Sequence, residues 1–280
     1  MITIVTDTLS CISLDEARQL GIPYVPQIII IGEESYRDDT EIDSKTFLKK
    51  LRTSPILPKT AAPPPELYRP IFEKYATPGN TVIVLCPSGL ISGTVRGATV
   101  AAQDFPEADI RVIDTLIIAT GLGSLARKAV EWVNSGLDAD TIVDKVQEMA
   151  SRWRVYFLVD TLEYLYKGGR IGAAQALVGS ILQFKPILTL KQGQIDSVEK
   201  QRTKRRALLR LNELICQDCP QTPDSFITVL QLGAESEARE LAKDFADYVG
   251  LPDVPIAEMP PAIGVHAGPG VLGVGYFVAK

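Results

Sequence analysis

Four short apolar segments recur along the first 160 residues, and their apolar side chains do not alternate regularly with polar ones. Uninterrupted runs of this kind are typical of strands that are buried on both faces of a mostly parallel sheet. The runs cover residues 2–6, 81–85, 110–113 and 155–159. Helical patterns separate them, near residues 13–20, 44–52, 65–76, 93–105, 122–134 and 139–151. This alternation of strand and helix predicts an α/β fold.

The second half of the chain has a different pattern. Residues 187–190 and 195–199 flank a polar turn, which predicts a β-hairpin. Earlier in the chain a polar interruption between residues 28–31 and Tyr36 predicts a hairpin or an edge strand. An amphipathic helix over 203–216 follows, then a strand at 226–231, a helix at 235–249 and a closing strand at 271–278. We therefore expect two α/β domains. The first, over 1–155, has a mostly parallel sheet flanked by helices, and the second, over 156–280, a mixed or antiparallel sheet.

Composition excludes several classes of protein. A net charge of -5 argues against nucleic acid as the principal partner, because phosphate binding needs a basic face. The N-terminus lacks a signal-peptide pattern and no apolar run approaches ~20 residues, so we expect a cytoplasmic protein without a membrane span. Four cysteines are too few for a disulfide framework. Cys216 and Cys219 form one C-x-x-C pair, but His266 is the only histidine, so we expect no metal site and no cofactor.

Two loops carry hydroxyl groups that could bind an anion. Residues 85–94 run from the end of a predicted strand into a helix, where free N–H groups and the helix dipole favour negative charge. Ser92 could hold a carboxylate or phosphate there, or could simply cap the helix. Residues 59–65 form a proline-rich turn that either presents Thr60 to a ligand or only starts the next helix.

Two further segments of the second half invite a functional interpretation. His266 lies in a glycine- and proline-rich loop, where it could donate a hydrogen bond to a carboxylate or be an ordinary surface residue. Residues 172–184 are apolar almost all round, which predicts a buried helix beside an acyl tunnel or tight packing between domains.

Charged residues are open to similar alternatives. For the acids at strand ends we expect loop-ordering hydrogen bonds to backbone N–H groups rather than catalysis; these acids are Asp7, Asp114 and Asp160. The basic face of the helix over 203–216 is either solvated or a docking surface, and it contains Arg202, Lys204, Arg205, Arg206 and Arg210.

Six motifs in order resemble the DegV family along the whole chain. They are Val5-Thr6-Asp7, Tyr36-Arg37-Asp38, residues 88–94 (SGLISGT), Val112 to Thr115 with Gly121 and Gly123, residues 167–172 (KGGRIG) and residues 261–270 (PAIGVHAGPG). The resemblance implies a fatty-acid-binding carrier of two α/β domains that encloses a ligand such as palmitate and is not an enzyme. It also implies a partner, a fatty-acid kinase that phosphorylates the presented acid, and a monomer or weak dimer.

The resemblance also places the family's ligands on this sequence. It puts the carboxylate contacts on Thr60 and Ser92 with His266 close by, and the supporting or adjacent residues on Ala61, Gly93, Thr94, Arg170 and Gly268. This chain departs from the family where Thr-Ser-Gln-Pro-Ser is usual, because Ala61-Ala62-Pro63-Pro64 follow Thr60 and lack a hydroxyl and an amide. It departs again at Thr8 and at residues 117–119 (IIA), where the family has serines.

Two other functions remain open on this sequence. One is an enzyme similar to small-hydroxyketone kinases, which would use His266 as a nucleophile on dihydroxyacetone. The other is a regulatory module that senses lipid and docks a partner through the basic helix. An enzyme would need a polar lining around its small substrate, and residues 172–184 supply little of it.

Overall fold

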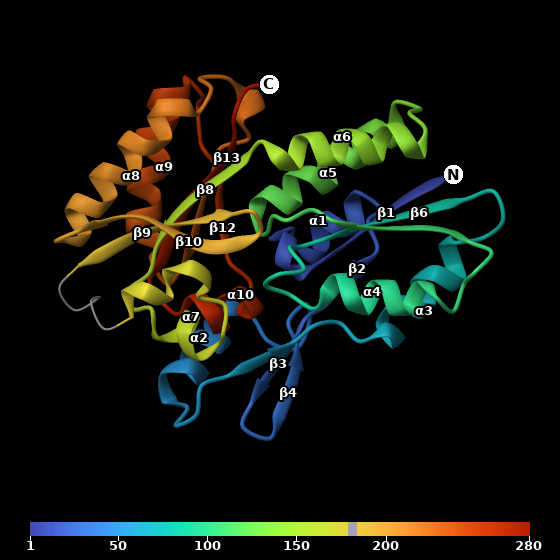
Figure 1. Ribbon diagram of the computed structural model, residues 1–280, viewed down its shortest axis with the longest axis horizontal. Coiled ribbons are helices and arrows are strands. Elements are labelled where there is room, and N and C mark those ends of the chain that lie inside the picture. Colours follow the sequence, from blue (N-terminus) through green and yellow to red (C-terminus); the bar gives the residue numbers. More distant parts are fainter. Residues whose placement is uncertain (179–183) are drawn as a thin grey trace. The chain divides into compact units, whose positions relative to one another are not determined.

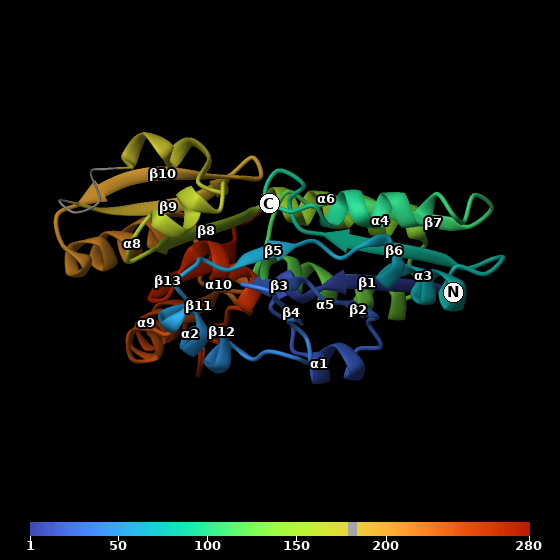
Figure 2. The same ribbon diagram turned by 90° about the horizontal axis from the view of Figure 1, so that it is seen from below.

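The computed structural model describes residues 1–178 and 184–280, which divide into two compact units (Figures 1 and 2). The first unit comprises Met1–Asp43 and Pro58–Ser151, and the second comprises Ser44–Leu57 and Arg152–Lys280. Residues 44–57 therefore group with the second unit, although they precede most of the first in sequence.

The first unit is built on a parallel sheet in the order β2-β1-β6-β7. Its strands are β1 (Ile2–Asp7), β2 (Tyr24–Val25), β6 (Thr81–Cys86) and β7 (Asp109–Asp114). A small antiparallel sheet in the order β4-β3-β5 joins it, with β3 (Ile28–Ile31), β4 (Glu34–Arg37) and β5 (Lys59–Ala61). Its helices are η1 (Thr8–Ser10), α1 (Leu14–Gln19), α3 (Pro65–Tyr75), α4 (Thr94–Ala102), α5 (Thr120–Asn134) and α6 (Ala139–Ser151).

Strand β6 shows why its sequence does not alternate. Val82 and Val84 share a core with Tyr68 and Phe72 of α3. Ile83 and Leu85 point to the opposite face, since neighbouring residues of a strand alternate, and both are fully buried. Helices α5 and α6 also contact β6. The strand is thus covered on both faces, as the apolar run predicted.

The second unit has a mixed sheet in the order β10-β9-β8-β13-β11-β12, in which only β11 and β12 pair in parallel among the described residues. Its strands are β8 (Trp153–Leu158), β9 (Lys185–Lys191), β10 (Gln194–Gln201), β11 (Thr228–Leu232), β12 (Ile256–Glu258) and β13 (Val271–Phe277). Its helices are α2 (Ser44–Thr53), α7 (Glu163–Lys167), η2 (Gly172–Leu177), α8 (Lys204–Asp218), η3 (Pro223–Ser225), α9 (Glu235–Val249) and α10 (Pro261–Ala267). Helices α8 and α9 (orange in Figure 1) pack into one core with the sheet. The α/β class with a parallel and a mixed sheet is confirmed.

The buried helix expected over 172–184 is wrong where the structure describes it; residues 179–183 lie outside the described part. Residues 172–177 form the 3-10 helix η2, in which Ala174 and Leu177 are buried, and the following Val178 is 42% exposed. Gly172 has φ +55° and lies so close to the Ile195 carbonyl that a Cβ there would collide with it. The backbone of Gly172 is thus in the left-handed region and in close contact with β10. A right-handed α-helix cannot begin with this conformation.

Candidate functional site

A network of buried polar side chains lies at the end of β1 in the first unit. We call it the Asp7 network and define it as Asp7, Gln27, Ser92 and Thr94. Gln27 Nε2 donates to Asp7 Oδ2 over 2.6 Å, and the Thr94 hydroxyl donates to the same oxygen over 3.0 Å. The Leu9 N–H donates to Asp7 Oδ1 over 3.1 Å, which orders η1. The expected loop-ordering role of Asp7 is therefore confirmed, and this carboxyl group has side-chain partners as well.

Burial dominates the electrostatics of Asp7. Its side chain is only 1% exposed, and this desolvation raises the pKa of the carboxyl group to about 7. The nearby charge of Asp38 adds to the increase, while the hydrogen bonds from Thr94 and Gln27 oppose it. Asp7 can therefore change its charge near neutral pH, which an exposed aspartate does not do.

Gln27 holds this network together, and our sequence analysis did not identify it. It is 2% exposed and lies between β2 and β3, next to the apolar run of β3. Its backbone N–H donates to Thr8 Oγ1 (3.1 Å) and to Asp38 Oδ1 (2.8 Å). The only available signal was a polar residue beside a buried strand, which is too weak to predict a role.

Ser92 connects the network to the surface. Its Oγ lies 2.9 Å from Thr94 Oγ1, and it accepts a longer bond of 3.3 Å from the Thr94 N–H. Ser92 thus has part of the capping role that we considered, although Gly93 is the residue at the N-cap of α4. Ser92 is only half-buried, whereas Thr94 is 1% exposed. A chain of hydrogen bonds therefore runs from the half-buried Ser92 hydroxyl through the Thr94 hydroxyl to the buried Asp7 carboxyl group.

Thr60 comes from a different strand of the same unit. It lies on β5 in register with Ile29 of β3, and it is half-buried. Two residues further along the chain, Ala62 approaches the start of α4, because a Cβ on Gly93 would lie 3.1 Å from Ala62 Cβ. The segments that carry Thr60, Ala61, Ser92 and Gly93 are thus neighbours in the first unit.

His266 lies in the second unit on a helix, so the loop that we expected around it is wrong. Helix α10 starts with Pro261 at its first turn and ends at Gly268, which has φ +79°. Proline favours the first turn of a helix, and glycine favours a left-handed end. Burial lowers the pKa of His266 to about 4, and the positive charge of Arg170 contributes to this decrease. The imidazole is therefore neutral at neutral pH.

The segment after α7 packs tightly against His266. A Cβ at Gly168 would collide with His266 Nδ1, and a Cβ at Gly268 would collide with the Tyr164 ring. Arg170 Nη1 donates to the Gly168 carbonyl over 2.7 Å. Arg170, His266 and Gly268, which the resemblance singled out, are thus neighbours around α7 and α10.

The other two acids at strand ends differ in their partners. Asp114 accepts hydrogen bonds from the Gly89 and Leu116 N–H groups, as expected. Asp160 lies two residues beyond β8 and forms a long ion pair of 3.7 Å with Lys204. No group of three or more His, Cys, Asp or Glu side chains in residues 1–178 and 184–280 could hold a metal ion. In the same residues no helix is both long and apolar enough to cross a membrane.

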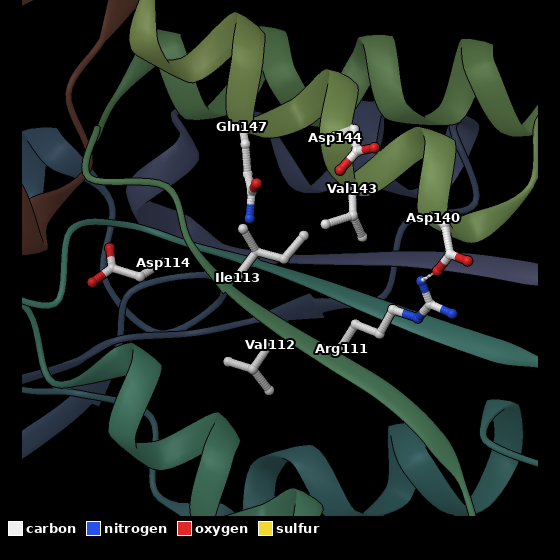
Figure 3. A pocket seen from close by; sticks show the side chains of 8 residues that line it. All are labelled: Arg111, Val112, Ile113, Asp114, Asp140, Val143, Asp144 and Gln147. Atoms are coloured by element: carbon white, nitrogen blue, oxygen red, sulfur yellow. Dashed lines mark hydrogen bonds and ion pairs between the residues drawn. The ribbon is translucent and has the colours of Figure 1, made fainter.

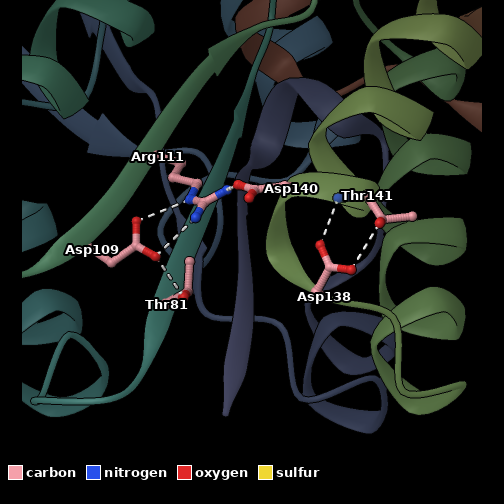
Figure 4. Close-up of polar contacts among 6 residues, drawn as sticks. All are labelled: Thr81, Asp109, Arg111, Asp138, Asp140 and Thr141. Carbon is pink, nitrogen blue, oxygen red and sulfur yellow. Dashed lines mark hydrogen bonds and ion pairs between the residues drawn. The ribbon is translucent and has the colours of Figure 1, made fainter.

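A groove of about 430 Å³ lies between β7 and α6, and Figure 3 shows the side chains that line it. They are Arg111, Val112, Ile113, Asp114, Asp140, Val143, Asp144 and Gln147. Figure 4 shows that the Arg111 guanidinium is held between Asp109, at 2.9 Å, and Asp140. Because two carboxylates neutralise this arginine, the groove has little attraction for an anionic ligand.

Comparison with known proteins gives one consistent family. A family model described as "Uncharacterised protein, DegV family" matches residues 1–279. A DegV domain-containing protein of Streptomyces coelicolor is 38% identical, over 98% of this chain and 97% of its own. A structure described as fatty acid binding of a DegV family protein from Thermus thermophilus is 30% identical with a TM-score of 0.85, covering 99% of both chains. DegV of Bacillus subtilis, described as a fatty acid binding protein, is 31% identical with a TM-score of 0.86, again over 99% of both.

Proposed function

The chain belongs to the DegV family, and from this premise we propose that it binds a long-chain fatty acid such as palmitate in a buried apolar pocket. The observation that carries this proposal is the half-buried Ser92 hydroxyl, which is hydrogen-bonded to Thr94 and through it to Asp7, and which lies on a segment adjacent in the fold to the one that carries Thr60. Two relatives of the same fold, at 30% and 31% identity, are described as binding fatty acids.

The head group needs hydrogen-bond donors more than catalytic groups. An unpaired buried polar group costs about 1–3 kcal/mol, and more if it is charged. In the proposed site the hydroxyls of Thr60 and Ser92 donate to the carboxylate, with Ala61, Gly93 and Thr94 adjacent. The N-terminus of α4 adds a favourable dipole. His266, with Arg170 and Gly268 beside it, stays in the proposal as a further contact, for which the family resemblance is the support.

The acyl chain supplies most of the affinity. At about 0.8 kcal/mol per buried methylene, a sixteen-carbon tail gains roughly 12 kcal/mol before the costs of ordering and association. Such a ligand needs an apolar lining and no reactive groups. We therefore propose a carrier, not an enzyme, that presents its bound acid to a fatty-acid kinase.

Helix α8 is the surface that we propose for the kinase. Lys204 pairs with Glu237 over 2.8 Å, and Arg210 pairs with Glu199 and Glu213 over 2.8 and 2.7 Å, so both already have carboxylate partners. Arg202, Arg205 and Arg206 are exposed around the start of the helix. Exposed guanidinium groups suit recognition of a partner that handles phosphate.

The fatty acid itself provides the test. The protein is purified from a bacterial host, extracted with solvent, and the extract analysed by mass spectrometry. We expect one long-chain fatty acid per chain, because an enclosed apolar pocket retains its ligand through purification. A polar metabolite in its place, or an empty protein that also fails to bind added palmitate, would show that the proposal is wrong.

A further inference from the structure

The Thr94 hydroxyl has three hydrogen-bond partners, which fills its capacity. Its oxygen lies 3.0 Å from Asp7 Oδ2, 3.0 Å from Gln27 Nε2 and 2.9 Å from Ser92 Oγ. A hydroxyl group has one proton to donate and two lone pairs that accept. Each of the three neighbours must therefore use either the Thr94 proton or one of its two lone pairs.

The charge of Asp7 determines which neighbour accepts the Thr94 proton and which neighbours donate to its lone pairs. Gln27 Nε2 is an amide nitrogen that only donates, so it occupies one lone pair. An ionised Asp7 only accepts, so it takes the Thr94 proton. The second lone pair of Thr94 then remains for Ser92, whose own proton must point inward to fill it.

This inward direction limits what Ser92 can offer a ligand. Its oxygen already accepts from the Thr94 N–H over 3.3 Å. With its proton directed at Thr94, Ser92 presents only a lone pair to the outside, which repels a carboxylate. When Asp7 carries a proton on Oδ2, Asp7 donates to Thr94 and Thr94 donates to Ser92. The Ser92 proton is then released to face outward.

We propose that Thr94 couples Asp7 to the head-group site, so that Asp7 takes up one proton from solvent when Ser92 donates to an anionic head group. This inference rests on the proposed function and deepens it, because it assigns Asp7 and Thr94 as positioning residues. Neither touches the ligand; they set the hydrogen-bond direction of the residue that does.

The surroundings of Asp7 allow this change of charge. Burial raises its pKa to about 7, so the proton is exchanged near neutral pH. Asp38 is the acidic neighbour that acts on it. The other titratable groups that interact with Asp7 are Cys11, Tyr24, Tyr68 and Cys86. Burial raises the pKa of each, so all four are neutral at neutral pH. The positive charge of Arg127 opposes this increase at Cys11.

The experiment uses hexadecanesulfonate, because a sulfonate stays anionic and contributes no proton of its own. Its binding to the full-length protein is measured calorimetrically at about pH 8 in two buffers of different ionisation enthalpy, which gives the number of protons taken up. We expect close to one proton per sulfonate. The dissociation constant should then rise nearly tenfold for each pH unit above about 7.5.

Thr94→Val removes the coupling hydroxyl and keeps the side-chain shape. We expect this variant to bind the sulfonate with no proton uptake and little dependence on pH. Thr8→Val is the matched control, because Thr8 Oγ1 accepts from the Gln27 N–H in the same buried cluster but lies off the path from Asp7 to Ser92. The Thr8→Val variant should retain the proton uptake of the wild type. Asp7→Asn, which cannot titrate, is a second variant that should lose it, should Thr94→Val fail to fold.

The outcomes separate this inference from the proposed function. Sulfonate binding without proton uptake, or equal uptake in wild type and Thr94→Val, overturns the coupling and leaves the carrier function standing. If neither the sulfonate nor palmitate binds the wild-type protein, the proposed function fails and the coupling fails with it.

Discussion

The Thr94 hydroxyl donates to the buried Asp7 carboxylate over 3.0 Å, although the two residues are 87 positions apart in the sequence. The bond joins the end of the first strand to the first turn of α4. It places a titratable group behind the loop that carries Ser92, and several predictions concern this loop and its neighbours.

The first prediction concerns stability and Asp7. Its pKa is 3.8 when unperturbed and about 7 in the fold, so the folded state binds the extra proton between these values. The contribution of Asp7 to stability is therefore complete below about pH 4 and is lost as the pH rises through about 7, by on the order of 4 kcal/mol. We expect Asp7→Asn to gain in unfolding free energy relative to wild type over this range. Urea unfolding of both proteins at a series of pH values measures this difference in unfolding free energy.

Thr8→Val serves as the control for this measurement. It loses a buried hydroxyl of the same cluster and keeps the carboxylate, so its pH dependence should follow that of the wild type. If the curves of Asp7→Asn and the wild type are parallel, Asp7 does not titrate in the folded protein near pH 7.

The second prediction concerns the head-group contacts. Thr60→Val or Ser92→Ala should each weaken palmitate binding by about 1–3 kcal/mol, because each removes one donor to a charged group. The double variant should lose less than the sum, since both hydroxyls share one ligand. Hexadecanol binding should change little, because the tail contacts remain.

The measurement is the ratio of palmitate to hexadecanol affinity in the three variants. Thr99→Val provides a matched control, because Thr99 lies exposed on α4 and its hydroxyl donates to the Val95 carbonyl of the same helix. A ratio unchanged from wild type in all three variants would place the carboxylate elsewhere.

The third prediction concerns His266. Its pKa falls from 6.5 to about 4 on folding, so the unfolded chain binds the proton between these values. This contribution to stability is complete above about pH 6.5 and is lost as the pH falls through about 4, by up to roughly 3 kcal/mol. We expect His266→Gln to flatten this acid-induced loss, measured by urea unfolding from about pH 7 to 4. An unchanged slope would contradict the neutral, buried state of the imidazole.

His266 also separates the carrier from the hydroxyketone enzyme. We expect no mass increase when the protein is incubated with dihydroxyacetone, because a carrier has no covalent step. We expect His266→Ala to weaken palmitate binding by about 1.5–3 kcal/mol, the contribution of one hydrogen bond to a charged group. A stable adduct that disappears in His266→Ala would support the enzyme.

The fourth prediction concerns the basic helix. Reversing the charge of Arg205 and Arg206 to Glu should slow association with a fatty-acid kinase and weaken its salt dependence, without changing palmitate affinity. Lys49→Glu with Arg52→Glu on α2 makes the same change in net charge at exposed positions of the same unit. Equal association rates for both double variants would mean that the start of α8 is only a solvated face.

Local chemistry made most of the secondary structure predictable. Two helix starts are marked by capping residues, since Ser13 accepts from the Glu16 N–H and Thr203 accepts from the Arg206 N–H. The hairpin of β9 and β10 turns at Gln192 and Gly193, both with positive φ. These features depend on residues within a few positions of one another, and apolar periodicity supplies the rest.

The sequence by itself therefore determined most of the strands and helices and the α/β class, and its motifs determined the family. Only the tertiary structure decided that Gln27 binds Asp7 and Thr94, that residues 44–57 belong to the second unit, and that Gly168 packs against His266. The physical reason is that these contacts depend on the order of the strands and the packing of the helices. Neither leaves a periodic signal in the chain, so a buried glutamine and a close glycine look ordinary until the fold brings their partners to them.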